Sequence, residues 1–149
     1  MGLIKIRKVL EKDKTALMDI CESSFPTDDI KEIIDSLITL RHFYVAEELT
    51  SGKLLGFIVY SANSSKDISH ILTLAVQPNS QREGIGTALI NHMLRRLEST
   101  TVKKIRLEVR ESNTAAIQFY QKLGFNIVGK INDYYAKGSD AFLMIKEII

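Results

Sequence analysis

The sequence has only one cysteine, two prolines and no tryptophan among its 149 residues. One cysteine cannot form an internal disulfide, so a reducing compartment is the simplest expectation. No apolar run approaches the roughly 20 residues that a membrane span requires. The first eight residues alternate apolar and basic side chains and lack the apolar block of a signal peptide. We therefore expect a cytoplasmic protein that does not enter a membrane.

The chain also lacks an excess of either charge, because 20 Lys and Arg residues oppose 18 Asp and Glu residues. Nucleic-acid binding domains usually concentrate basic residues on one face, so no direct contact with nucleic acid is expected. His42 and His92 belong to no group of His, Cys and carboxylate residues with the spacing of a metal site, and no metal is expected. Cys21 has helical spacing from Leu17, which is typical of a core residue rather than a nucleophile.

Hydrophobic residues make up 45% of the chain, and their periodicity predicts a mixed α/β fold. The expected elements, in order, are a strand at 3–9, a helix capped by Asp13, a helix from about Asp28, strands at 43–47, 54–60 and 68–76, a helix at 84–98, a strand at 102–109, a helix at 113–122 capped by Asn113 and ended by Gly124, and strands at 125–131 and 141–148. No internal repeat or linker interrupts this order, so residues 1–149 are expected to form a single domain with helices packed on a sheet.

The most informative segment is 74–87, in which a strand ends in a loop with two glycines that becomes the first turn of a helix. The first amides of a helix have no partner within it, and the helix dipole adds positive charge there. Gly84 and Gly86 let a phosphate approach the backbone, so the segment predicts a site for a phosphate or diphosphate. Alternatively, the two glycines only allow strand and helix to pack closely. The segment has neither the three glycines of dinucleotide-binding loops nor the Gly-Lys-Ser/Thr of a P-loop.

A second segment, residues 107–125, reads L-E-V-R-E-S-N-T-A-A-I-Q-F-Y-Q-K-L-G-F. Together with Q-R-E-G-I-G-T-A-L at 81–89, it resembles the GCN5-related N-acetyltransferase (GNAT) superfamily, and the order of elements agrees over essentially the whole chain. The chain is most similar to the N-terminal protein acetyltransferases, including the ribosomal-protein alanine acetyltransferases. L-E-V-R, Phe25-Pro26 between the first two helices, and N-D-Y-Y at 132–135 carry this closer resemblance.

The resemblance implies an α/β fold with a mostly antiparallel central sheet of about seven strands, four flanking helices and a V-shaped splay between strands 4 and 5. It implies an N-acetyltransferase that transfers acetyl from acetyl-CoA to a primary amine, most simply the N-terminal α-amine of a protein or peptide. The alternatives are an acetyltransferase for lysine or a small amine such as a polyamine, and a non-catalytic CoA-binding protein of the same fold. A non-catalytic protein would need neither Glu108 nor Tyr120.

The resemblance also implies roles for individual residues. Glu108 would take the proton from the amine through a water molecule, and Tyr120 would protonate the departing thiolate. The cofactor-binding residues would be the backbone of Leu74, Ala75 and Val76, the amides of Arg82, Glu83, Gly84, Ile85, Gly86 and Thr87, and the side chain of Asn113. The substrate's first residues would contact Phe25, Pro26, Tyr134 and Tyr135.

The residue pattern alone leaves other interpretations open for some of these side chains. Glu108 shares a strand face with Lys104 and Arg106, as in a solvated row of charges. His70 is either an auxiliary base or a histidine whose hydrogen bonds are satisfied at the sheet surface.

The remaining candidates have similar alternatives. Tyr120 has the spacing of a helix packing residue, and Asn113 is a helix cap whether or not it contacts a ligand. Tyr134 and Tyr135 are also consistent with exposed loop aromatics.

The proposed chemistry suits an α-amine. Its pKa is about 7.7–8.0, against about 10.4 for lysine, so roughly a quarter of an α-amine but about a thousandth of a lysine is neutral at pH 7.4. One carboxylate acting through water is an adequate base for such an amine. Direct attack on the thioester then needs neither a metal nor a covalent enzyme intermediate.

Overall fold

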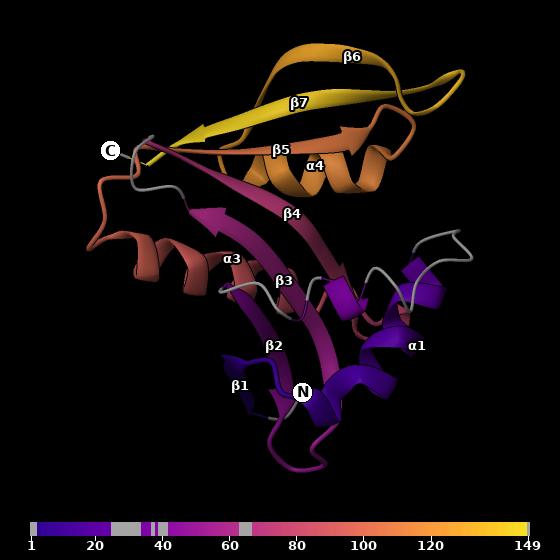
Figure 1. The fold of residues 1–149 in the computed structure, drawn as a ribbon, viewed down its shortest axis with the longest axis vertical. Helices are drawn as coiled ribbons and strands as arrows, with labels where there is room; N and C mark the ends of the chain where they lie inside the picture. The colour runs from indigo at the N-terminus through magenta and orange to yellow at the C-terminus, as the bar shows by residue number, and fades with distance from the viewer. Residues whose placement is uncertain (1–2, 25–33, 37, 39–41, 63–66, 149) are drawn as a thin grey trace. The chain divides into compact units, whose positions relative to one another are not determined.

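The computed structural model describes residues 3–24, 34–36, 38, 42–62 and 67–148. Within them, one sheet contains seven strands in the order β1-β2-β3-β4-β5-β7-β6 (Figure 1). The strands are β1 (Ile4–Lys8), β2 (Phe43–Glu48), β3 (Leu54–Ala62), β4 (Ile68–Val76), β5 (Lys104–Arg110), β6 (Asn126–Ala136) and β7 (Ser139–Glu147). The helices are α1 (Lys14–Ser24), α3 (Ile85–Leu97) and α4 (Thr114–Lys122), with short 3-10 helices η1 (Glu11–Asp13) and η2 (Pro78–Ser80).

Residues 34–36 are helical, as expected for the second predicted helix. The rest of that helix and the break at Phe25-Pro26 lie outside the described residues. No helix in the described part of the chain is long and apolar enough to cross a membrane.

The strand directions confirm the expected mixed, mostly antiparallel sheet. β1 with β2, β2 with β3, β5 with β7 and β6 with β7 are antiparallel, and β4 with β5 is parallel. The parallel pairing joins residues 68–70 to residues 104–106, at the start of both strands. Among the described residues the pairing stops there, which confirms the expected splay between strands 4 and 5.

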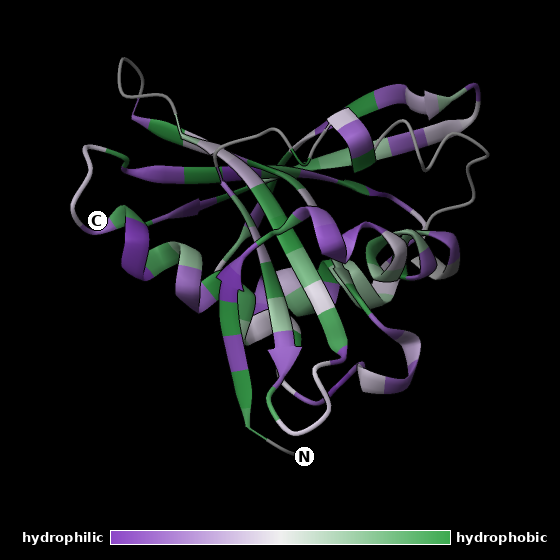
Figure 2. Ribbon diagram, turned by 60° about the horizontal axis from the view of Figure 1, so that its bottom comes forward, coloured by the Kyte–Doolittle hydropathy of each residue, from purple (hydrophilic) through white to green (hydrophobic). Residues whose placement is uncertain are grey.

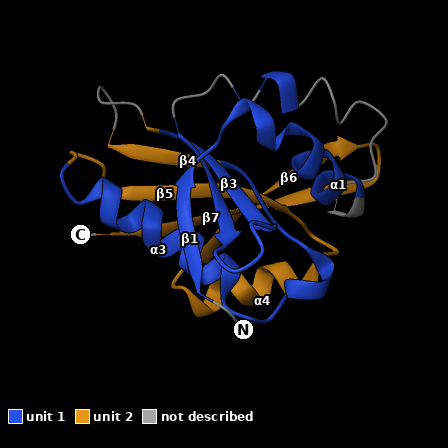
Figure 3. Ribbon diagram, turned by 90° about the horizontal axis from the view of Figure 1, so that it is seen from below, with its two compact units in different colours: residues 1–61, 72–99 blue, residues 62–71, 100–149 orange. Residues whose placement is uncertain are grey.

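The chain divides into two compact units (Figure 3). Unit 1 contains residues 1–61 and 72–99, and unit 2 contains residues 62–71 and 100–149. β4 contributes its first residues to unit 2 and its later residues to unit 1.

In unit 1, helices cover both faces of the strands. Phe43 and Phe57 belong to a buried cluster with Leu17 of α1. Tyr44 points to the opposite face, because the side chains of neighbouring strand residues point to alternate faces. The centroid of its ring lies 4.7 Å from that of His92 on α3. Burial on both faces explains the continuous hydrophobic run of β3. Green, hydrophobic residues accordingly occupy most of the central strands in Figure 2, while the helices mix green and purple.

Cys21 belongs to the buried cluster of unit 1 and is 3% exposed. Burial raises the pKa of its thiol to about 11. Since the thiolate is the nucleophilic form, the prediction that Cys21 is a core residue is confirmed.

Asp13 does not act as the simple helix cap that the sequence predicts. Its carboxylate accepts hydrogen bonds from the Arg7 guanidinium at 2.8 and 3.0 Å and from the Leu10 amide at 2.8 Å. Burial opposes ionisation of Asp13, but the hydrogen bonds from Arg7 and Leu10 outweigh it and lower the pKa of the carboxyl. Asp13 therefore joins β1 to η1, because charge-assisted hydrogen bonds from a partly buried guanidinium are stronger than those from helix amides.

Unit 2 follows the predicted strand and helix patterns closely. Ile105, Leu107 and Val109 of β5 are buried, as their alternation predicts. The Asn113 side chain accepts a hydrogen bond from the Ala116 amide at 3.1 Å and so caps α4. Gly124 ends this segment in the left-handed conformation, with φ of 94°.

The last two strands are longer than the sequence predicts. β6 extends to Ala136 rather than ending near Ile131, and β7 begins at Ser139. Shifts in the register of β6 against β7 interrupt the regular alternation of side chains. The strand ends were predicted from the alternation of apolar and polar residues, and they are wrong where the register shifts break that alternation.

Gly56 of β3 is the glycine that close packing requires, and its substitution gives a test of the unit 1 core. A Cβ atom at Gly56 would lie 2.7 Å from the carbonyl oxygen of Ala75 and 3.3 Å from Cγ2 of Ile85. We expect Gly56→Ala to reduce the free energy of unfolding by about 1–3 kcal/mol, as overpacking does, measured by urea denaturation. Gly129→Ala is the control, because a Cβ there meets nothing within 4 Å; equal losses in both variants would contradict the packing role.

Candidate active site

The N-terminus of α3, in unit 1, has the backbone geometry of an anion site. Gly84 is its N-cap residue, in the left-handed conformation with φ of 83°, and Arg82 two residues earlier also has a positive φ, of 67°. The first hydrogen bond of the helix runs from the Ala88 amide to the Gly84 carbonyl, at 2.9 Å. The amides of residues 85–87 thus have no carbonyl one turn back, and Gly84 has no side chain to cap them.

The space around Gly84 fits a bulky anion. A Cβ atom built there meets nothing within 4 Å, so close packing does not explain this glycine. Residues 81–84 are exposed. Open space, free amides and the positive end of the helix dipole are what a diphosphate needs.

The backbone of Leu74, Ala75 and Val76 lies at the end of β4, beyond the three residues that pair with β5. Ala75 is buried, whereas Leu74 and Val76 are partly exposed. The Val76 carbonyl accepts a hydrogen bond from the Gln81 side chain at 3.4 Å. This contact ties the end of the strand to the loop that precedes α3.

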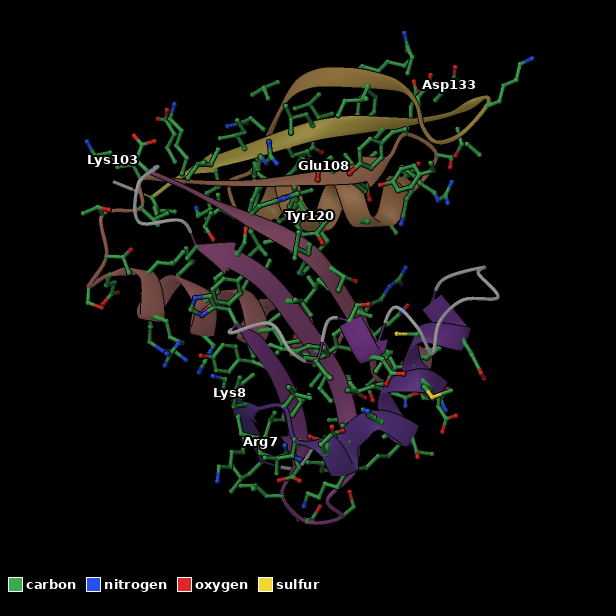
Figure 4. The ribbon with its side chains drawn as sticks, viewed as in Figure 1. Arg7, Lys8, Lys103, Glu108, Tyr120 and Asp133 are labelled. Atoms are coloured by element: carbon green, nitrogen blue, oxygen red, sulfur yellow. The ribbon has the colours of Figure 1, made fainter. Side chains whose placement is uncertain are left out.

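In unit 2, the start of β4 brings His70 to Glu108 of β5. The His70 Nε2 and Glu108 Oε2 atoms are 2.6 Å apart, and the two side chains are 20% and 10% exposed. Figure 4 shows Glu108 on β5. Glu108 is therefore not a member of a fully solvated row of charges, and its nearest partner is the histidine that the sequence left with two interpretations.

Arg106 determines how the His70 ring is protonated. Its Nη2 lies 3.3 Å from His70 Nδ1. A guanidinium can only donate, so Nδ1 must accept, and the proton of the neutral imidazole is on Nε2. That N–H donates to Glu108, which leaves the second carboxylate oxygen for another partner. The tautomer follows from these hydrogen-bond partners.

Tyr120 of α4 is 9% exposed and packs edge-on against Phe119 and Phe125, with ring centroids 5.1 and 5.5 Å away. Burial raises the pKa of its phenol well above the usual value, and Tyr135 adds to the effect. Tyr120 is thus a packing residue, as its spacing predicts, and its hydroxyl remains protonated near neutral pH. Figure 4 shows it on α4.

The side chain of Asn113 uses its oxygen for the helix cap. Its NH2 group is a second hydrogen-bonding function, so capping and ligand contact are compatible. Asn113 is exposed at the start of α4.

Tyr134 and Tyr135 lie on β6, 46% and 37% exposed, with their rings edge-to-face at 4.9 Å. The Arg110 guanidinium lies 4.1 Å from the centroid of the Tyr135 ring. Burial raises the pKa of both phenols; Glu108 contributes next for Tyr134, and Tyr134 contributes next for Tyr135. The contact with Arg110 ties Tyr135 to β5, the strand that also carries Glu108.

Each unit brings together its own part of the predicted set. Unit 1 contains 74–76 and 82–87 on one continuous stretch of chain, and unit 2 contains Glu108, Asn113, Tyr120 and the tyrosine pair. Phe25 and Pro26 lie outside the described residues. No group of His, Cys, Asp and Glu side chains suited to a metal ion occurs in the part of the chain that the structure describes.

The chain belongs to the acetyltransferase (GNAT) family, whose family model matches residues 7–125. It is similar to an N-alpha-acetyltransferase of Sulfurisphaera tokodaii, with 35% identity over 113 residues that span 68% of this chain and 66% of that relative.

Two solved structures are also similar. Ard1 from Thermoplasma volcanium superposes with a TM-score of 0.88 and 31% identity, over 98% of both chains. The ribosomal-protein-S18-alanine N-acetyltransferase from Escherichia coli has a TM-score of 0.83 and 30% identity, over 98% of this chain and 94% of that one. The fold expected from the sequence is confirmed.

Sequence reasoning missed three contributors to this region. Arg106 was assigned only to a charged strand face, and Arg110 and Asp140 were given no role. Their positions depend on strand register, which hydrophobic alternation does not reveal. The available signals were the L-E-V-R motif, which ends at Arg110, and, for Asp140, its position a few residues after N-D-Y-Y.

Replacing Gly84 tests the anion site. We expect Gly84→Ala to cost about 1 kcal/mol of stability, because a side chain is strained at positive φ. We also expect it to raise the acetyl-CoA Kd at least about tenfold, since the added methyl enters the open space beside the free amides. Isothermal calorimetry measures the affinity.

Gly52→Ala is a matched control. Gly52 also has a positive φ, of 74°, and open space at its Cβ position, but it lies in the turn between β2 and β3. If acetyl-CoA affinity is unchanged in both variants, or decreases equally in both, Gly84 is not part of the anion site.

Proposed function

We propose that this chain is an acetyl-CoA-dependent N-acetyltransferase for the N-terminal α-amine of proteins or peptides. The observation that carries the chemistry is the nearly buried Glu108 carboxylate, held by His70 at 2.6 Å with one oxygen left for another partner. The α-amine specificity is supported by the N-alpha-acetyltransferase name of one relative and by the alanine N-acetyltransferase among the similar structures.

The proposal treats residues 1–149 as a single acetyltransferase domain. The chain passes between the two units at residues 61–62, 71–72 and 99–100, and one family model covers parts of both. Neither unit alone contains both the glycine loop and Glu108.

Glu108 acts as the base for the incoming ammonium group. Its free oxygen accepts the proton, directly or through a water molecule, while the His70 N–H holds the other oxygen. A lone pair is thereby exposed on the amine nitrogen, which attacks the thioester carbonyl. An α-amine needs little help from such a base because its pKa lies near neutrality, at about 7.7–8.0.

Tyr120 acts on the leaving group. Because burial raises the pKa of its phenol, full transfer of the proton to a thiolate, whose thiol has a pKa of about 8.5, is unfavourable at rest. The protonated hydroxyl is best suited to donate a hydrogen bond to the sulfur as charge develops there. This hydrogen bond stabilises the thiolate as the carbon–sulfur bond breaks, and the proton that the attacking nitrogen loses on forming the amide balances the charge of the thiolate.

Acetyl-CoA, when bound, supplies the activated acetyl group as a thioester. The amides at the start of α3 would hold its diphosphate, and the backbone of 74–76 and the Asn113 side chain would hold its pantetheine arm. Tyr134 and Tyr135, with Phe25 and Pro26, would contact the acceptor's first residues. The proposal includes no metal, nucleic acid or membrane, and the cytoplasmic location stays a prediction.

Two substitutions test the chemistry. We expect Glu108→Gln and Tyr120→Phe each to lower kcat for acetyl transfer at least about tenfold, because the first removes the base and the second removes the hydrogen-bond donor to the leaving thiolate. The acetyl-CoA Kd, measured by calorimetry, should stay within about twofold, since neither residue binds the diphosphate.

Glu98→Gln is the control for loss of a carboxylate, because Glu98 is exposed at the end of α3. Full activity in both active-site variants would refute the residue assignment. Acetyl-CoA binding without transfer to any amine would instead favour the non-catalytic alternative.

A peptide panel tests the acceptor. We expect transfer to peptides with a free N-terminus to exceed transfer to α-blocked peptides with a free lysine by about 100-fold or more at pH 7.4, given the difference in neutral amine. Mass spectrometry of the products locates the acetyl group. A preference for the blocked lysine peptides, or for a polyamine included in the panel, would replace the α-amine assignment.

A further inference from the structure

The hairpin of β6 and β7 contains a wide bulge. Ile131 pairs with Ala141 and Ala136 pairs with Ser139, so the four residues 132–135 lie opposite Asp140 alone. Asp133 has a positive φ of 56°, which is uncommon for a residue other than glycine. A regular ladder cannot satisfy the backbone of such a bulge, so its hydrogen bonds must come from elsewhere.

The Asp140 carboxylate supplies the missing partner. Its Oδ1 accepts a hydrogen bond from the Asp133 amide at 2.8 Å, and its Oδ2 lies 3.3 Å from Lys130 Nζ. The hydrogen bond from the Asp133 amide is the main cause of a lowered pKa at Asp140, followed by Lys130. Asp133 in turn accepts from the Gly138 amide at 2.7 Å, which closes the turn. Two carboxylates therefore hold the bulge where the strand pairing is interrupted.

Arg110 holds the same bulge from the neighbouring strand. Its guanidinium donates to Ser139 Oγ and lies 4.1 Å from the centre of the Tyr135 ring. Stacking of a guanidinium on an aromatic ring restricts the ring as well as attracting it. Arg110 shares a face of β5 with Glu108, so its contact with Tyr135 holds the Tyr134–Tyr135 pair in a defined arrangement beside the strand that carries Glu108. Figure 4 shows Asp133, the residue before Tyr134, in the β6–β7 hairpin.

We propose that Asp140 is a positioning residue for the amine acceptor, because its carboxylate closes the 132–135 bulge that presents Tyr134 and Tyr135 next to the strand that carries Glu108. This inference rests on the proposed function, in which the acceptor contacts those tyrosines. Asp140 itself does not touch the acceptor. Its effect passes through the Asp133 amide and should be confined to acceptor binding.

The experiment compares Asp140→Ala with Asp140→Asn. Alanine removes both the hydrogen-bond acceptor and the ion pair with Lys130, whereas asparagine keeps an oxygen for the Asp133 amide. Lys137→Ala is the matched control, since Lys137 is exposed in the turn of the same hairpin. The measurements are acceptor KM and kcat, the acetyl-CoA Kd by calorimetry, and hydrogen exchange of the 131–140 segment.

We expect Asp140→Ala to raise the acceptor KM about tenfold, with kcat within about threefold and the acetyl-CoA Kd within about twofold, because it removes acceptor positioning alone. Hydrogen exchange in residues 131–140 should become faster. Asp140→Asn should recover most of the wild-type KM, and Lys137→Ala should match wild type in every measurement.

Several results would overturn the proposal. An unchanged KM despite faster exchange would mean that the bulge does not serve the acceptor. An equal loss of acetyl-CoA affinity, or no recovery with Asp140→Asn, would reduce Asp140 to a general structural role. If Asp140→Ala does not fold, Asp140→Glu replaces it: the longer side chain displaces the carboxylate, so a raised KM supports the proposal and a wild-type KM overturns it.

Assays with different acceptors distinguish failure of the α-amine assignment from failure of the proposed role of Asp140. If wild-type protein acetylates only lysine peptides, the α-amine assignment fails. The same variants are then compared with the lysine peptide as acceptor. A selective rise in KM supports the role of Asp140, and its absence overturns that role.

Discussion

The short parallel pairing of β4 with β5 is the constraint on which the candidate chemistry depends. It joins residues 68–70 to residues 104–106 and so sets the register that brings His70 to Glu108. A shift by one residue would turn His70 to the opposite face and leave Glu108 without its partner. Because the pairing stops after three residues, the later backbone of β4 is not used by β5. The same strand thus supplies the histidine beside Glu108 at its start and, towards its end, backbone that does not pair with β5.

Most of the fold was predictable because each helix or strand leaves a recognisable pattern in its own stretch of sequence. The rows of apolar residues in α3, the alternation in β5 and the cap at Asn113 are all contacts within one element or with one layer, and periodicity reports them directly. For Gly84 the sequence left two interpretations open, an anion site and close strand–helix packing, and the open space at its Cβ position argues against the packing interpretation. The structure separated it from Gly56, the glycine that close packing requires and that the sequence did not distinguish.

The unpredicted features depend on contacts between different elements of secondary structure. His70 and Glu108 are 38 residues apart, and only strand register makes them neighbours. Asp13 was expected to bind helix amides, but Arg7 on a different element competes successfully for its carboxylate. The bulge opposite Asp140 breaks the alternation on which strand prediction relies, so the sequence placed the end of β6 too early.

The irregularity of β6 also bears on self-association. β6 is an edge strand of the sheet, eleven residues long and largely exposed, with Ile127 and Val128 facing solvent. A long, regular edge strand presents unpaired N–H and C=O groups that can pair with a strand of another chain and so promote aggregation. Its two register shifts interrupt the row of free amides and carbonyls, and Lys130 adds a charge that a stacked copy would have to bring close to its own. Straightening this strand by design would therefore risk aggregation.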